Sequence, residues 1–106
     1  MSQPPLPQVL VVDDEAELLC MVKDTLSSTP CELLLSTSAE EALLLLSKSE
    51  RIVLIIADLR LPGQDGLELL EQAREIVPSA GRILMTAYPQ GARAIDAVAR
   101  GTAQRY

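Results

Sequence analysis

Residues 9–14, VLVVDD, decide the fold of this chain, and residues 52–58, IVLIIAD, repeat their pattern. Each segment is an uninterrupted apolar run that ends in aspartate. Such runs are typical of strands that are buried on both faces of a parallel sheet. In these sheets, ligands bind just beyond the carboxyl ends of the strands, where Asp13, Asp14 and Asp58 fall. The two segments therefore predict a parallel sheet with an acidic site at its carboxyl end.

Strand-like and helix-like segments alternate along the rest of the chain. We expect strands at residues 9–12, 32–35, 52–57 and 82–85, and helices at residues 15–27, from the S-x-x-E capping box at 38–41 onward, at 67–76 and at 92–99. This order implies an α/β fold with an open, doubly wound parallel sheet. The common strand order 2-1-3-4-5 would make the first and third strands neighbours, and with them the three aspartates.

The composition of the 106-residue chain limits its size and its partners. Its length suits one domain, expected at residues 8–106 after a proline-rich arm at residues 1–7. The net charge of −6 argues against direct binding of nucleic acid, because phosphate contacts need clustered Lys and Arg. No apolar run approaches the roughly 20 residues of a membrane span. The N-terminus lacks the charged start and apolar stretch of a secretion signal.

The cysteine and histidine content argues against a zinc site and favours a reducing cytosol. Cys20 and Cys31 have no CxxC spacing, and the chain contains no histidine, so a zinc site is not expected. Two isolated cysteines suit a reducing compartment, where we expect both to be small core residues.

The acidic residues predict a particular metal. Three carboxylates at one place repel one another, and a hard divalent cation with oxygen ligands relieves that repulsion. Mg2+ is the usual choice where phosphate also binds. Taken alone, Asp13 and Asp14 would be read as an acidic cluster favoured by the dipole of the following helix. Asp58 and the aspartate–glycine turn after it favour the metal site instead.

Three motifs together resemble the receiver domain of two-component response regulators, the CheY-like superfamily. They are VVDDE at residues 11–15, DLRLPGQDG at residues 58–66 and TAY at residues 86–88. The resemblance covers residues 8–106 and implies a flavodoxin-like fold with strand order 2-1-3-4-5. It also implies a cytoplasmic phosphorelay signalling domain with Mg2+ as cofactor, which transfers a phosphoryl group only to and from its own aspartate and is otherwise not an enzyme.

The resemblance assigns roles to the acidic residues. It makes Asp58 the phosphoacceptor, which takes its phosphoryl group from a histidine kinase or a phosphotransfer protein. It makes Asp14 a direct Mg2+ ligand and Asp13 an acid that acts largely through metal-bound water. Asp58 and the backbone carbonyl of Arg60 complete the implied ligand set.

The resemblance also implies a conformational switch. Thr86 matches a hydroxyl that bonds a phosphoryl oxygen, and Ala87 matches a small residue that leaves room for the phosphoryl group. Tyr106 falls where the family places its switch aromatic. Without the resemblance, Thr86 would be an ordinary hydroxyl at the end of a strand, and Tyr88 stays open between a partner-facing and an ordinary surface residue.

One part of the family pattern is missing. The family places a Lys, usually followed by Pro, at the end of the fifth strand, and neither Lys23 nor Lys48 falls at a strand end. We therefore expect a receiver that is truncated at its C-terminus, with strand five and the last helix largely missing and a covalently linked output domain downstream. We expect weaker phosphorylation than with the Lys. We also expect self-association through the exposed fourth strand or fourth helix.

Two other functions compete with this interpretation. A pseudo-receiver would serve as a dimerisation or docking module without phosphorylation, and the complete aspartate set argues against it. A phosphatase with an aspartate nucleophile would need a second aspartate two residues later, where this chain has Arg60. The sequence does not identify the cognate kinase, its signal or the output domain.

Overall fold

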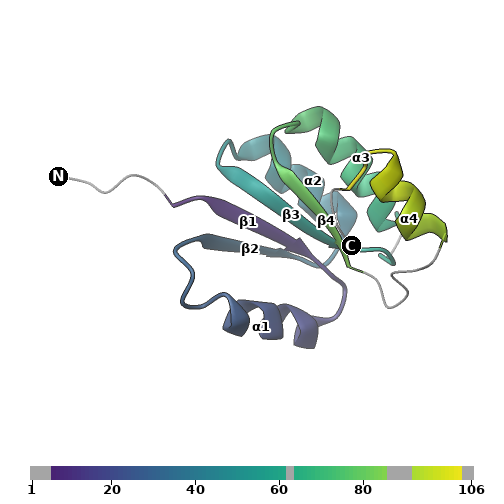
Figure 1. Ribbon diagram of the computed structural model, residues 1–106. Coiled ribbons are helices and arrows are strands. Elements are labelled where there is room, and N and C mark those ends of the chain that lie inside the picture. The colour runs from purple at the N-terminus through teal and green to yellow at the C-terminus, as the bar shows by residue number, and fades with distance from the viewer. Residues whose placement is uncertain (1–5, 62–63, 86–91, 104–106) are drawn as a thin grey trace.

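The computed structural model describes residues 6–61, 64–85 and 92–103, in which strands and helices alternate (Figure 1). The strands are β1 (Gln8–Val12), β2 (Glu32–Ser36), β3 (Ile52–Asp58) and β4 (Gly81–Met85). The helices are α1 (Ala16–Thr25), α2 (Ala39–Lys48), α3 (Gly66–Ile76) and α4 (Ala92–Ala99). The predicted element order is confirmed, with small shifts at the boundaries. None of the helices in the described ranges is long and apolar enough to cross a membrane.

The four strands form one parallel sheet in the order β2-β1-β3-β4. This order matches the first four positions of the predicted flavodoxin-like arrangement. At the carboxyl end of β1, Val12 pairs with Ser36 of β2 and with Ala57 of β3. Asp13 and Asp58 therefore follow neighbouring strands at the same level of the sheet.

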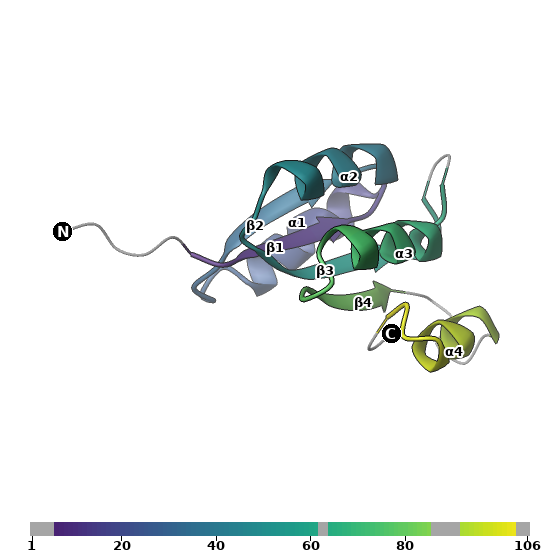
Figure 2. The ribbon, with the colours of Figure 1, turned by 90° about the horizontal axis from the view of Figure 1, so that it is seen from above.

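Helices cover the sheet from both sides, with α1 on one face and α2 and α3 on the other (Figures 1 and 2). All five residues of β1 are buried. Leu10 and Val12 join the core under α2 and α3, whereas Val9 and Val11 join a smaller cluster with Leu19 of α1. Two buried faces explain why the sequence of this strand carries no polar alternation.

Side-chain and glycine caps define several helix ends. The Ser38 hydroxyl accepts a bond of 3.2 Å from the Glu41 amide, so the N-cap predicted for α2 is confirmed. The amide of Ser38 donates to the hydroxyl of Ser36 at 3.4 Å. After α4, Gly101 has a φ of 77°, the left-handed geometry expected of a C-cap glycine.

The expectation of two core cysteines is wrong for one of them. Cys20 of α1 is exposed, and Cys31 is half-buried against the small cluster around Leu19. Successive residues of a helix are turned by about 100°, so Cys20 points away from the face that buries Leu19. The single apolar face of α1 is too narrow to bury Leu19 and Cys20 together.

The end of the predicted arm is attached to the domain. Residues 1–5 lie outside the described residues, and both Leu6 and Pro7 are exposed. The carbonyl of Pro7 accepts from the amide of Glu32 at 2.9 Å, and that of Leu6 accepts from Arg51 Nη1 at 3.3 Å. The backbone at residues 6–7 is therefore bonded to the first residue of β2 and to the side chain of the residue before β3.

A network around Arg82 fastens the segment after α4 to β4. Arg82 is only 5% exposed. Its Nε donates to the carbonyl of Thr102 at 2.9 Å, Nη2 to that of Gly101 at 3.1 Å and Nη1 to that of Ala80 at 3.1 Å. Burial lowers the pKa of Arg82 from its ordinary value, and the positive charge of Arg74 lowers it further. Backbone carbonyls compensate for the burial of this cation.

Candidate functional site

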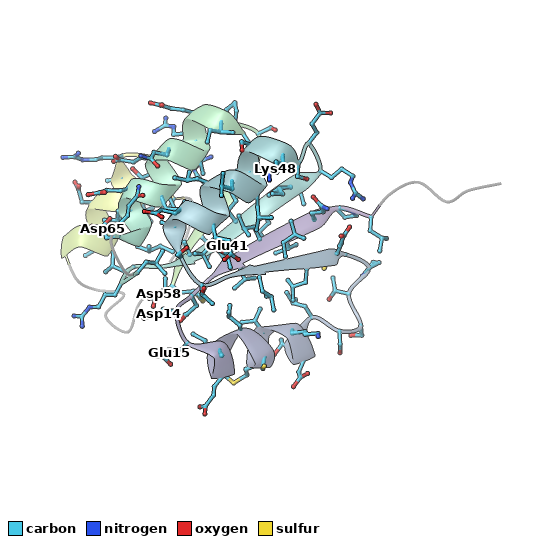
Figure 3. The ribbon with its side chains drawn as sticks, turned by 180° about the vertical axis from the view of Figure 1, so that it is seen from behind. Asp14, Glu15, Glu41, Lys48, Asp58 and Asp65 are labelled. Atoms are coloured by element: carbon cyan, nitrogen blue, oxygen red, sulfur yellow. The ribbon has the colours of Figure 1, made fainter. Side chains whose placement is uncertain are left out.

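Three aspartates meet at the carboxyl end of the sheet. One carboxylate oxygen from each of Asp13, Asp14 and Asp58 lies within 4.8 Å of the others. Figure 3 shows Asp14 and Asp58 next to each other at this end, with Glu15 close by. The three side chains differ in exposure, because Asp13 is buried, Asp58 is half-buried and Asp14 is exposed. The clustering predicted from the two apolar runs is therefore present.

Asp13 is held on both sides by backbone groups. Its amide donates to the carbonyl of Ser36 at 3.0 Å, which extends the pairing of β1 with β2 by one residue. Its Oδ1 accepts from the amide of Glu15 at 2.8 Å, which satisfies a backbone donor at the start of α1. These bonds fix the carboxylate with one oxygen already used.

The other oxygen of Asp13 finds no hydrogen-bond partner in the described part of the chain. Oδ2 is buried and makes no hydrogen bond to any described residue. Burial raises the pKa of Asp13 above its ordinary value of 3.8, and the charges of Asp58, Asp14 and Glu15 add to the rise. The bond from the Glu15 amide opposes it. A buried carboxylate oxygen without a donor, facing like charges, is costly unless a cation approaches it.

Asp58 is the last residue of β3, and the loop after it returns to the same place. The amide of Leu59 donates to the carbonyl of Met85 at 3.0 Å, so β3 stays paired with β4 past the aspartate. The amide of Gly66 then donates to the carbonyl of Leu59 at 2.9 Å. Asp65 caps α3 by accepting from the Glu68 amide at 2.9 Å. The start of α3 is thus packed against the backbone of the candidate phosphoacceptor.

The donor set fits a hard divalent cation. Three carboxylates supply oxygen ligands, and Asp13 also has a buried oxygen that accepts no bond from any described residue. Mg2+ binds such oxygens and usually keeps several waters, which the exposed side of Asp14 allows. The arrangement can therefore hold a small cation next to the half-buried carboxylate of Asp58.

The other predicted site residues lie at the surface or outside the described residues. Arg60 is exposed, and the ligand role of its carbonyl stays a prediction. Thr86, Ala87 and Tyr106 lie outside the described residues, as does Tyr88. The switch proposed for them therefore stays a prediction as well.

Sequence reasoning missed the groups that support the aspartates. Ser36 positions Asp13 through its carbonyl, and only the pairing of β1 with β2 reveals this contact. The sequence predicts only a turn at Gly66, although this residue lies against the backbone of Asp58. The aspartate–glycine pair at residues 65–66 was the available signal, but it does not say what the glycine contacts.

Known proteins share the sequence pattern of the chain. The family described as the response regulator receiver domain matches residues 9–105. The response regulator protein FleR of Pseudomonas aeruginosa is 38% identical over 96 residues, which cover 91% of this chain and 20% of that protein. The transcriptional regulatory protein GlrR of Escherichia coli is 31% identical over 101 residues, 95% of this chain and 22% of that protein. The chain thus spans about a fifth of the length of these relatives.

Solved structures share its fold. The signal receiver domain of an HD domain-containing protein from Pseudomonas fluorescens is 33% identical with a TM-score of 0.87, covering 100% of this chain and 77% of that one. The response regulator protein TrrA from Thermotoga maritima, solved in complex with Mg2+ and BeF, is 30% identical with a TM-score of 0.80. That alignment covers 95% of this chain and 84% of TrrA.

Proposed function

The chain belongs to the response regulator receiver domain family, and from this membership we propose that it accepts a phosphoryl group on Asp58 with Mg2+ as cofactor. The observation that carries the proposal is the meeting of three carboxylates at one end of the sheet, together with a buried oxygen of Asp13 that accepts no hydrogen bond from the described residues. A purely structural acidic cluster would not be expected to keep that oxygen unsatisfied. Family membership supplies the reaction for which such a site is suited.

In the proposed reaction, a carboxylate oxygen of Asp58 attacks the phosphorus of a phosphohistidine. The new bond joins this oxygen to phosphorus, the phosphorus–nitrogen bond breaks, and the imidazole leaves and takes up a proton. The product is an acyl phosphate on Asp58. Asp58 is half-buried, so its side chain stays partly accessible to a phosphodonor.

Asp13, Asp14, Asp58 and the carbonyl of Arg60 would hold the metal. When bound, Mg2+ supplies positive charge that offsets the repulsion between the carboxylates and the incoming phosphoryl oxygens. Asp13 would be a fixed acid beside the metal and would act largely through metal-bound water, because the amide of Glu15 and the carbonyl of Ser36 set its position. Asp14 is exposed and contributes the ligand that lies closest to solvent.

The proposal includes partners and setting. The phosphodonor would be a histidine kinase or a phosphotransfer protein, and the output would come from a covalently linked domain. We further propose a cytoplasmic location, no direct contact with nucleic acid, and no enzymatic activity beyond transfer to and from Asp58. Self-association through β4 or α4 is part of the proposal. In α4, Ile95 is 52% and Val98 is 36% exposed, which supplies apolar surface for such a contact.

The test is labelling with acetyl phosphate, followed by intact mass. We expect the mass of one phosphoryl group on the wild-type chain in Mg2+, and none after Mg2+ is removed by a chelator. Asp58→Asn should abolish labelling, because an amide oxygen is a far weaker nucleophile. Asp65→Asn is the matched control: it makes the same change in the same loop, and asparagine caps helices as well as aspartate.

Each outcome separates two functions. Labelling that is lost in Asp58→Asn and kept in Asp65→Asn supports the phosphoacceptor. Labelling that persists in Asp58→Asn would place the phosphoryl group elsewhere and refute the assignment. No labelling of the wild type at any Mg2+ concentration would favour a pseudo-receiver that docks partners without phosphorylation.

A further inference from the structure

Gly66 occupies a place where no side chain fits. An ideal Cβ at this residue would lie 2.8 Å from the carbonyl carbon of Asp58, closer still to its oxygen, and 3.1 Å from Cα of Leu59. Carbon atoms in contact prefer separations of about 3.5–4.0 Å. All three atoms belong to the backbone, so no rotamer change relieves the overlap. Space and not backbone angle requires a glycine here, because Gly66 does not have a positive φ; among the described residues Gly101 is the glycine that does.

The helix side of this contact is firmly held. Leu69, Leu70 and Ala73 of α3 are each 0% exposed and belong to the main core. A shift of α3 away from β3 would pull these side chains out of close packing, which opens voids and costs free energy. The helix is therefore the stiffer partner.

The Asp58 side is freer. The pairing of β3 with β1 ends at Ala57 opposite Val12, so among the strands of the described residues β4 alone pairs with the backbone at Asp58. The bond from the Gly66 amide to the carbonyl of Leu59 also closes a loop that contains Arg60. A Cβ at residue 66 would thus displace Asp58 and this loop before it displaced the helix.

We propose that Gly66 is a positioning residue for the phosphoryl-transfer site, setting the place of Asp58 and of the Arg60 carbonyl through direct backbone contact. The inference rests on the proposed function, because it concerns the position of the phosphoacceptor and of a metal ligand. Asp13 is held separately, since Ser36 and Glu15 fix its position. A side chain at residue 66 would therefore split the ligand set, moving the β3 ligands relative to the β1 ligands.

The test compares two glycine-to-alanine variants. Gly66→Ala should weaken Mg2+ binding by about 10- to 100-fold, the effect typical of losing a group that orients metal ligands. Its labelling rate at saturating Mg2+ should fall by about 100-fold, since misplacing a nucleophile by about 1 Å has that effect. Mg2+ affinity is measured by calorimetry and labelling by intact mass with acetyl phosphate.

Gly81→Ala is the matched control. Gly81 begins β4, at the end of the sheet opposite the site, and its Cβ would meet the flexible side chain of Leu54 at 3.1 Å. This variant should lose some stability but keep the Mg2+ affinity and labelling rate of the wild type. Both variants are measured in trimethylamine N-oxide, an osmolyte that favours the folded state, with circular dichroism to establish folding.

The outcomes distinguish the inference from the function beneath it. A folded Gly66→Ala chain that binds Mg2+ and labels like the wild type would overturn the inference and leave the function intact. A Gly66→Ala chain that stays unfolded in the osmolyte would overturn it too, because the glycine would then serve the fold and not the site. A wild type that neither binds Mg2+ nor labels would refute the function itself.

Discussion

Asp13 and Arg82 are both buried charges, with 1% and 5% exposure, but their surroundings differ completely. Three carbonyls accept bonds from the guanidinium of Arg82. One oxygen of Asp13 accepts a single amide, and the other accepts nothing from the described residues. Backbone carbonyls compensate for the buried charge of Arg82, whereas Asp13 keeps a buried oxygen that no described residue satisfies.

The difference distinguishes architecture from a site. A satisfied buried charge fixes the chain segments that satisfy it. Here these segments are Ala80, just before β4, and Thr102, after α4. An unsatisfied buried charge costs stability in the empty state and gains it back when a ligand binds. The two residues should therefore respond in opposite directions to the loss of their charge.

The largest effect is expected at Arg82. Arg82→Met keeps much of the side-chain volume but removes three donors, and we expect about 3 kcal/mol less unfolding free energy. Urea unfolding measures the change. The Mg2+ affinity of the folded variant should stay the same, because Arg82 pairs with Ile55, three residues before Asp58.

Arg74→Met is the control for this change. Arg74 is exposed and donates to the carbonyl of Arg100 at 3.2 Å. Its loss should cost no more than about 1 kcal/mol, the usual range for one hydrogen bond. Equal losses from the two variants would contradict the view that burial makes the Arg82 network important.

At Asp13, loss of the charge should stabilise the protein, whereas at Arg82 it destabilises it. Without metal, Asp13→Asn should raise the unfolding free energy by about 1–3 kcal/mol, the cost of an unsatisfied buried polar group. The amide oxygen still accepts from Glu15, and the new amide nitrogen is a donor among carboxylates. In saturating Mg2+ the order should reverse, because the wild type gains stability from binding. A variant less stable than the wild type in a chelator would refute this prediction.

The pH dependence tests the same residue without the metal. Burial raises the pKa of Asp13 in the folded state above its ordinary value of 3.8, which the unfolded chain keeps. At a pH between the ordinary and the raised pKa, the folded state therefore binds more protons than the unfolded state. Stability contributed by Asp13 therefore falls as pH rises through this window and recovers as pH falls toward 3.8. The stability of the wild type relative to Asp13→Asn should improve as pH is lowered from neutrality in a chelator. A difference that does not change with pH would contradict it.

The sequence predicted most of the fold and the meeting of the aspartates. Residues 9–12 and 52–57 are apolar throughout, and only a two-sided parallel sheet buries such runs, so their neighbouring carboxyl ends followed from topology. A local pattern also marked the Ser38 cap. These features depend on short stretches of chain or on a topology with few alternatives.

Features that depend on distant contacts were not predictable. Asp13 and Asp14 are adjacent and chemically identical, and only the packing around the start of α1 makes one buried and the other exposed. The acceptors of Arg82 include residues about 20 positions later in the chain, and nothing in the local sequence links them. The lack of room for a side chain at Gly66 likewise depends on how the core places α3.

The smallest effect is expected for a charge pair at the surface. Glu32 and Arg51 form an ion pair of 3.3 Å, with side chains 46% and 43% exposed. Water screens such a pair and its side chains lose entropy in forming it, so Glu32→Gln should change the unfolding free energy by less than about 0.5 kcal/mol. The glutamine oxygen can still accept the bond that Gln8 now donates to the carboxylate at 3.2 Å. A loss as large as that of Arg82→Met would mean that charge itself, and not its burial, decides the stability of this domain.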